Sequence, residues 1–160
     1  MTRRASRADA GLHRPTGSTI AGIHGAYPKR LSHTARALLA LEILAAYAQA
    51  RHALSRDQIA TVVARLRSSS PSAGPPVTNS LAEARRLGRA VARLLRYVPG
   101  DTRCLARSLV LTRLLARRGI QAKLVIGAQA EPEFLAHAWV EHDGNPVLDP
   151  GEDFGRLVEL

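Results

Sequence analysis

Residues 101–119 (DTRCLARSLVLTRLLARRG) constrain the fold most, because they place the only cysteine of the chain at the start of an amphipathic helix. Pro99 and Gly100 interrupt the preceding pattern, and Asp101 or Thr102 can cap the free N–H groups of the new helix. Apolar side chains then recur with helical spacing. Gly119 ends the predicted helix, after two arginines that suit a helix C-terminus.

The lone cysteine, Cys104, lies in the first turn of this predicted helix, beside Arg103 and Arg107. The positive end of the helix dipole and both guanidinium groups favour the thiolate, which is the nucleophilic form of cysteine. The structural alternative is a small buried residue of a core helix, because free cysteine is among the most buried residue types. Both interpretations are open at this point.

The chain after this helix predicts a small antiparallel sheet. Residues 123–127 (KLVIG) and 135–141 (LAHAWVE) have strand patterns, and the second alternates His137 and Trp139 on one face with alanine and valine on the other. A third short strand, residues 146–148, follows a turn and leads to Asp149.

Adjacent antiparallel strands can bring the carboxylate of Asp149 beside the imidazole of His137. With Cys104 at a helix N-terminus, the sequence then offers a nucleophile, a base and an orienting acid. Each residue also has a structural alternative: His137 can be a core histidine, and Asp149 can begin a turn before Pro150. Trp139 can be a core residue or the wall of a substrate pocket.

The first hundred residues predict a tail and three helices. Residues 1–30 are rich in glycine and polar side chains without a sustained period, and we expect a flexible basic tail. Residues 31–160 are expected to form one domain, with a helical part at 31–98 and a catalytic core at 99–160. The predicted helices and their caps are 32–52 capped by Ser32, 55–67 with a capping box of Ser55 and Gln58, and 80–97 with a capping box of Ser80 and Glu83.

The net charge of +10 is unevenly distributed. Residues 1–130 carry 22 of the 23 Lys and Arg and five of the 13 acids, a charge of +17, whereas residues 131–160 carry Arg156 and eight acids, a charge of −7. This asymmetry favours electrostatic guidance of a partner, and arginines on solvated helix faces are the alternative explanation. The arginines are scattered, aromatic residues are few and no nucleic-acid-binding motif appears, so we expect no nucleic-acid partner.

Several further classes are disfavoured. One cysteine excludes an internal disulfide and fits a reducing cytoplasm, where we expect the protein because no apolar signal segment follows the N-terminal arginines. The longest apolar run, residues 37–46, contains Glu42 and is too short to span a membrane. The histidines lack metal-ligand spacing, and a site of His137, His142 and Asp149 has no recognisable motif, so we expect neither metal nor cofactor.

The motifs RCLARSL, LLARRGI, KLVIG, HAWVE and LDP, between residues 98 and 149, resemble the transglutaminase-like region of the lasso-peptide leader peptidases, the microcin J25 processing protein family. The resemblance implies an α+β, papain/transglutaminase-like fold, in which N-terminal helices and a catalytic helix pack on a small antiparallel sheet. It also implies that Cys104, His137 and Asp149 are the catalytic residues. Trp139, Arg103 and Arg107 are the candidate substrate-binding residues.

Proteins of this family remove the leader from a lasso precursor peptide, so that a separate cyclase can close the ring. Longer members carry a winged-helix recognition domain before the protease region. The first hundred residues of this chain, a predicted tail and three helices, do not resemble that domain. The resemblance therefore implies a separate small winged-helix leader-recognition protein as a partner, with the lasso cyclase as a further candidate. Two alternatives stay open: a transglutaminase-like acyltransferase, and a non-catalytic peptide-binding module with the same shell.

Overall fold

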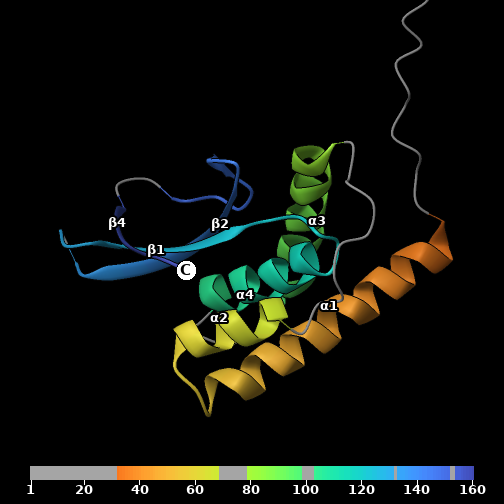
Figure 1. Cartoon of the computed structure of the whole chain (residues 1–160), viewed down its shortest axis with the longest axis horizontal. Helices are drawn as coiled ribbons and strands as arrows, with labels where there is room; N and C mark the ends of the chain where they lie inside the picture. The colour runs from red at the N-terminus through yellow and green to blue at the C-terminus, as the bar shows by residue number, and fades with distance from the viewer. Residues whose placement is uncertain (1–31, 69–78, 99–102, 132, 152–153) are drawn as a thin grey trace, which may run out of the picture. The chain divides into compact units, whose positions relative to one another are not determined.

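The computed structural model describes residues 32–68, 79–98, 103–131, 133–151 and 154–160. In this part of the chain, four helices come before a four-stranded antiparallel sheet (Figure 1). The predicted α+β class is therefore confirmed. The predicted tail, residues 1–30, and the predicted cap of the cysteine helix, residues 101–102, lie outside the described residues.

The first helix, α1 (His33–Leu54), begins where the sequence predicts it. Ser32 is its N-cap, and the hydroxyl accepts a hydrogen bond from the Ala35 N–H at 3.2 Å. The second helix, α2 (Ile59–Ser68), begins later than predicted, since the Ser55 hydroxyl donates back to the His52 carbonyl at 2.7 Å and so belongs to the end of α1. The predicted capping box at Ser55 is wrong because a serine can bond to the turn before it as readily as to the turn after it.

The third helix, α3 (Ser80–Leu95), is capped by Asn79, whose side-chain oxygen accepts from the Ala82 N–H at 3.2 Å. The predicted capping box of Ser80 and Glu83 is wrong, because both side chains have other partners. The Ser80 hydroxyl lies 2.8 Å from Nε2 of His142, and the Glu83 carboxylate accepts two hydrogen bonds from Arg86. The first contact joins α3 to the sheet, which no local sequence pattern could indicate.

The fourth helix, α4 (Arg103–Ala116), is the centre of the packing and contacts all three other helices and the sheet. Figure 1 shows it lying along the sheet, with α1 and α2 on its other side. The predicted end is confirmed, since Gly119 has a φ of 67° and the Ile120 N–H returns to the Leu115 carbonyl at 3.0 Å. Its fully buried apolar side chains are Leu109, Val110, Leu111, Leu114 and Leu115.

The sheet has the strand order β3-β2-β1-β4. Its strands are β1 (Lys123–Gln129), β2 (Leu135–His142), β3 (Asn145–Pro146) and β4 (Gly155–Glu159). The first three were predicted, although β3 covers residues 145–146 instead of the expected 146–148. The strand β4 was not predicted, because it is an exposed edge strand without alternating burial.

The two faces of β2 differ, as its sequence predicts. Ala138 and Val140 point into the core shared with the helices, whereas Trp139 is buried on the opposite face, against Gly127 of β1. A Cβ at Gly127 would lie only 2.9 Å from the Trp139 ring and 2.7 Å from the Gly155 carbonyl oxygen. Gly127 therefore allows β4 and the indole to approach the sheet closely.

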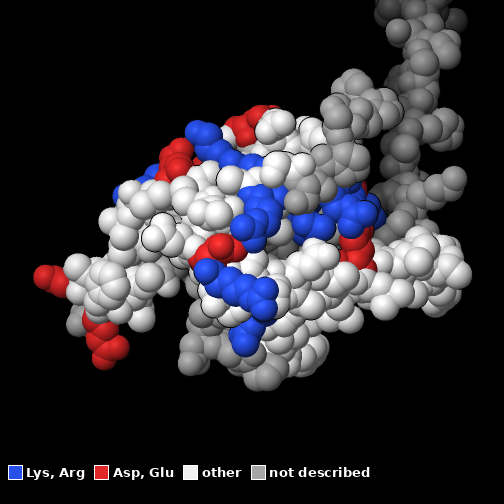
Figure 2. All heavy atoms as spheres, turned by 60° about the horizontal axis from the view of Figure 1, so that its bottom comes forward, with Lys and Arg blue, Asp and Glu red and all other residues white. Residues whose placement is uncertain are grey.

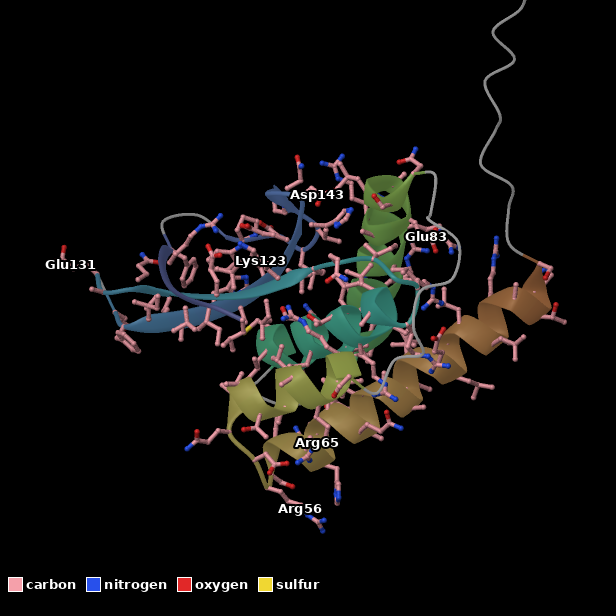
Figure 3. The ribbon with its side chains drawn as sticks, viewed as in Figure 1. Arg56, Arg65, Glu83, Lys123, Glu131 and Asp143 are labelled. Carbon is pink, nitrogen blue, oxygen red and sulfur yellow. The ribbon has the colours of Figure 1, made fainter. Side chains whose placement is uncertain are left out.

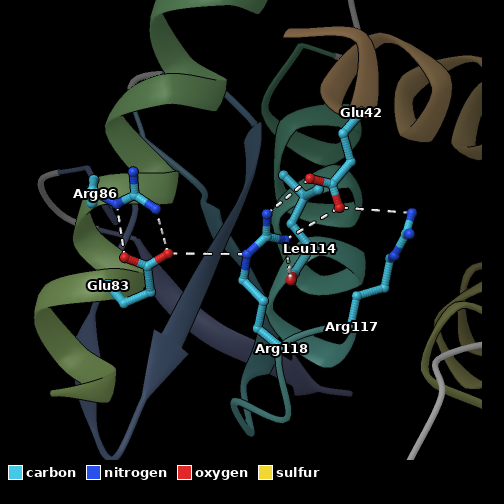
Figure 4. A network of polar contacts seen from close by, with 6 residues as sticks. All are labelled: Glu42, Glu83, Arg86, Leu114, Arg117 and Arg118. Atoms are coloured by element: carbon cyan, nitrogen blue, oxygen red, sulfur yellow. Dashed lines mark hydrogen bonds and ion pairs between the residues drawn. The ribbon is translucent and has the colours of Figure 1, made fainter. Parts of the chain in front are cut away.

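An ion-pair network joins three of the helical segments at the end of α4 (Figure 4). Arg118 donates to Glu42 of α1 at 2.8 Å and to the Leu114 carbonyl at 2.9 Å, and its Nε lies 4.0 Å from the Glu83 carboxylate of α3. The hydrogen bonds from Arg86 are the main reason why the pKa of Glu83 lies below its ordinary value. This network fixes the C-terminal end of α4 between α1 and α3.

Candidate functional site

Cys104 is the second residue of α4 and is half-buried, with its side chain packed against the hydrophobic core. Its place in the first helical turn is the one that the sequence predicts. The sequence after it folds locally as a helix because the apolar residues that follow all face the core.

One turn further along α4, Ser108 joins the helix to the sheet. Its fully buried hydroxyl donates to the carbonyl oxygen of Ala138 in β2 at 2.9 Å. Residues four apart lie on the same face of a helix, so Cys104 and Ser108 share the face that meets β2. Ala138 directly follows His137, and this bond therefore fixes the beginning of α4 beside the strand that carries the histidine.

The Ala138 carbonyl is available because β3 is short. The Val140 carbonyl accepts the Val147 N–H at 2.8 Å, and β3 pairs only with Glu141 and His142. Carbonyls two residues apart on a strand point the same way, so that of Ala138 lies on this edge beyond the end of β3. The Ser108 hydroxyl therefore donates to the Ala138 carbonyl, which would accept a main-chain N–H if β3 were longer.

His137 is half-buried on the face of β2 that carries Trp139. Its Nε2 lies 3.0 Å from the carbonyl oxygen of Asp149. The imidazole stacks on Trp139, with ring centroids 6.2 Å apart and planes at 18°, and lies 5.2 Å from the ring of Phe154. These contacts limit the directions in which the imidazole can turn.

The structure brings His137 and Asp149 together through the main chain of the aspartate. The Asp149 carboxylate instead accepts the Gly151 N–H at 3.0 Å, which is the turn-forming role that the sequence also allowed. Gly151 has a φ of 72°, and a Cβ there would lie 2.9 Å from the Phe154 ring. Sequence reasoning missed Phe154 as a neighbour of the histidine, and the Asp-Pro-Gly turn was the signal that could have indicated it.

The three candidate substrate-binding residues have different surroundings. Trp139 is only 2% exposed, and its Nε1 donates to Glu141 at 2.9 Å, so the indole is a core side chain with one ring face toward His137. Arg107 has a buried Nε for which the described residues offer no hydrogen-bond partner. Arg103 begins α4, but its side chain lies outside the described part of the chain.

A charged cavity of about 550 Å³ lies beside the sheet, and Cys104 is not among the residues that line it. Its charged side chains are largely paired with one another: Arg156 bonds to Glu141 at 2.6 Å and to Glu159 at 2.8 Å, and Lys123 bonds to Glu159 at 3.0 Å. The hydrogen bond from Lys123, followed by that from Arg156, lowers the pKa of Glu159. Figure 3 shows Lys123 and Asp143 on this side.

Two general properties of the site region follow from the described residues. No group of three or more His, Cys, Asp or Glu side chains among them is placed to hold a metal ion. None of the described helices combines the length and the apolar character that a membrane crossing requires.

Comparisons with curated proteins and with solved structures give no match. One family model does match, over residues 43–159, and this region contains Cys104, His137 and Asp149. Since the match covers well over half of the chain, this protein belongs to the Transglutaminase-like superfamily, whose members are generally cysteine peptidases or acyltransferases, and the predicted papain/transglutaminase-like fold is confirmed.

Proposed function

We propose that this chain is a cysteine peptidase that removes the leader from a ribosomally made lasso-peptide precursor. Its catalytic residues would be Cys104, His137 and Asp149, the last acting through its main-chain carbonyl. The superfamily supports the chemical class, and the motifs RCLARSL and HAWVE, which resemble those of the leader peptidases, support the substrate.

The observation that carries the proposal furthest is the hydrogen bond of Ser108 to Ala138. It joins the turn of α4 after Cys104 to the residue after His137, so the elements that carry the nucleophile and the base are fixed to each other. The imidazole itself lies on the face of β2 opposite to the one on which Ala138 packs. A buried bond of this kind is one support for a catalytic arrangement, and the approach of the Cys104 thiol to the imidazole of His137 is part of the proposal.

The contact of His137 with Asp149 suggests how the proton would move. When Nε2–H donates to the Asp149 carbonyl, the lone pair of the imidazole lies on Nδ1. Nδ1 would therefore take the proton of the Cys104 thiol as the sulfur attacks the scissile carbonyl carbon. The resulting imidazolium would return this proton to the leaving amine, which departs as the thioester forms.

Deacylation would complete the reaction. Water would give a proton to Nδ1 of His137 and attack the thioester, and the Cys104 sulfur would leave with the carboxyl product released. The main-chain N–H of Cys104, at the free N-terminal end of α4, is a candidate donor to the oxyanion. No step needs a metal or a nucleotide.

The partners belong to the same proposal. A separate small winged-helix protein would present the leader, the cyclase would act on the released core peptide, and the reaction would take place in the cytoplasm. These assignments depend on the resemblance of residues 98–149 to the leader peptidases.

The test is mass spectrometry of a candidate lasso precursor incubated with the protein, with and without the recognition protein. We expect cleavage at one position, abolished in Cys104→Ala and His137→Ala and unchanged in His33→Ala, which alters an exposed histidine of α1. Labelling by iodoacetamide reports independently on whether the Cys104 thiol is reactive.

The other outcomes separate the alternatives. A cross-linked product that contains an added amine would indicate an acyltransferase. An intact precursor with rapid labelling of Cys104 would refute the peptide substrate but not the nucleophile. Slow labelling together with full biological activity of Cys104→Ala would indicate a binding module.

A further inference from the structure

A groove between α1 and α3 combines an apolar floor with a basic rim. Its volume is about 560 Å³, and it lies on the helical part of the chain. Leu39, Ala40 and Ile43 of α1 and Ala90 and Leu94 of α3 form the floor. Tyr97, which is 77% exposed, extends the floor beyond the end of α3.

Four arginines and no acidic residue line the rim. Arg86 is paired with Glu83, but Arg36, Arg89 and Arg93 have no ion-pair or hydrogen-bond partner in the described part of the chain. Three unpaired cations around one apolar groove repel each other, and an acidic ligand would relieve this repulsion. Figure 2 shows one face of the molecule, on which Lys and Arg side chains lie together with several Asp and Glu side chains.

We propose that this groove binds an acidic, amphipathic peptide segment of another polypeptide. Its bulky apolar side chains would occupy the floor, and its carboxylates would meet Arg36, Arg89 and Arg93. Docking of the apolar face of a helix in a groove is a common form of peptide recognition, and complementary charge fixes its register. Binding of such a segment does not require that the chain is a peptidase.

Charge favours a segment of another polypeptide over two other possible occupants of the groove, the N-terminal segment and a second copy of this chain. Residues 1–31 carry six Lys or Arg and one Asp, a charge of +5, so their charge does not complement that of the rim. The β1–β2 hairpin of a second copy is acidic, with Glu131 and Glu133 beside the exposed Phe134, and Figure 3 shows Glu131 at its tip. Each copy, however, carries a net charge of +10, which opposes self-association.

The test uses fluorescence anisotropy with a labelled synthetic helix of roughly four turns, with leucines on one face and glutamates on the other. The protein is the full chain with Cys104→Ser, so that no cleavage can interfere. We expect saturable binding that weakens by about tenfold in Arg89→Glu/Arg93→Glu, because each exposed ion pair contributes a factor of about two to five. Tyr97→Ala should weaken binding as well.

The matched control is Arg51→Glu/Arg85→Glu, which makes the same charge change at two exposed helix positions outside the groove. Circular dichroism confirms that each variant is folded. Equal affinity of the control and the double variant for the peptide would indicate unspecific attraction and overturn the proposal. The proposal would also be overturned if the protein with the unaltered groove did not bind the peptide at low salt. Sedimentation that shows a dimer dissociated by Arg89→Glu/Arg93→Glu would overturn it in favour of a second copy.

Discussion

Replacement of Ser108 by alanine tests the bond that joins α4 to β2. The hydroxyl is fully buried, donates at 2.9 Å, and reaches a carbonyl at the open edge of the strand. The variant loses the hydrogen bond and leaves the buried Ala138 carbonyl without this donor. The expected decrease in the free energy of unfolding is therefore about 1–3 kcal/mol, the range for a buried polar group that loses its partner.

Equilibrium unfolding in urea, followed by far-ultraviolet circular dichroism, measures this change. With a slope of about 2 kcal/mol per molar urea, the unfolding midpoint should decrease by about 0.5–1.5 M while the slope itself stays constant. Ser68→Ala is the matched control, because among the described residues the exposed Ser68 hydroxyl bonds to carbonyls of its own helix, those of Ala64 and Arg65. Its midpoint should change by less than about 0.3 M, since such surface changes affect stability by at most about 0.5 kcal/mol.

Equal midpoints for Ser108→Ala and Ser68→Ala would refute the reasoning. The loss of the Ser108 donor to the Ala138 carbonyl would then not lower the free energy of unfolding. Precursor cleavage adds a second readout. The variant should lose cleavage rate even under conditions in which it is fully folded, since the bond fixes the beginning of α4 beside the histidine strand.

Three further predictions follow from the structure. Gly127→Ala should destabilise the protein by about 1–3 kcal/mol, as expected for overpacking against Trp139, whereas Gly155→Ala, whose Cβ would have its nearest neighbour at 3.6 Å, should have little effect on thermal unfolding. The lowered pKa of Glu83 means that its ion pair stabilises the fold above pH 4.5 and loses this effect as pH falls further, so the stability difference between wild type and Glu83→Gln in urea should shrink below that pH. Asp149→Asn keeps both the main-chain carbonyl and an acceptor for the Gly151 N–H, so precursor cleavage should fall less than about tenfold; a loss of about 10⁴ would show that the carboxylate itself is required.

Local patterns predicted most of the elements. The helix around Cys104 and its end at Gly119 follow from apolar spacing and from the freedom of glycine at positive φ, and the alternation around Trp139 predicts the two faces of β2. The capping boxes at Ser55 and Ser80 were wrong, because a local signal cannot tell which of several acceptors a hydroxyl will meet. The strand β4 was missed because its exposed side chains carry no burial pattern.

The sequence by itself determined the residue types of the candidate site and the elements that carry them: a cysteine in a first helical turn, a histidine on a strand and an aspartate before a Pro-Gly turn. Only the tertiary structure decided how they meet. The short β3 leaves the Ala138 carbonyl for Ser108, and the turn uses the Asp149 carboxylate so that the imidazole faces the carbonyl instead. These contacts join residues 12 and 30 positions apart, and such distances are fixed by the packing of the whole core rather than by any local preference of the chain.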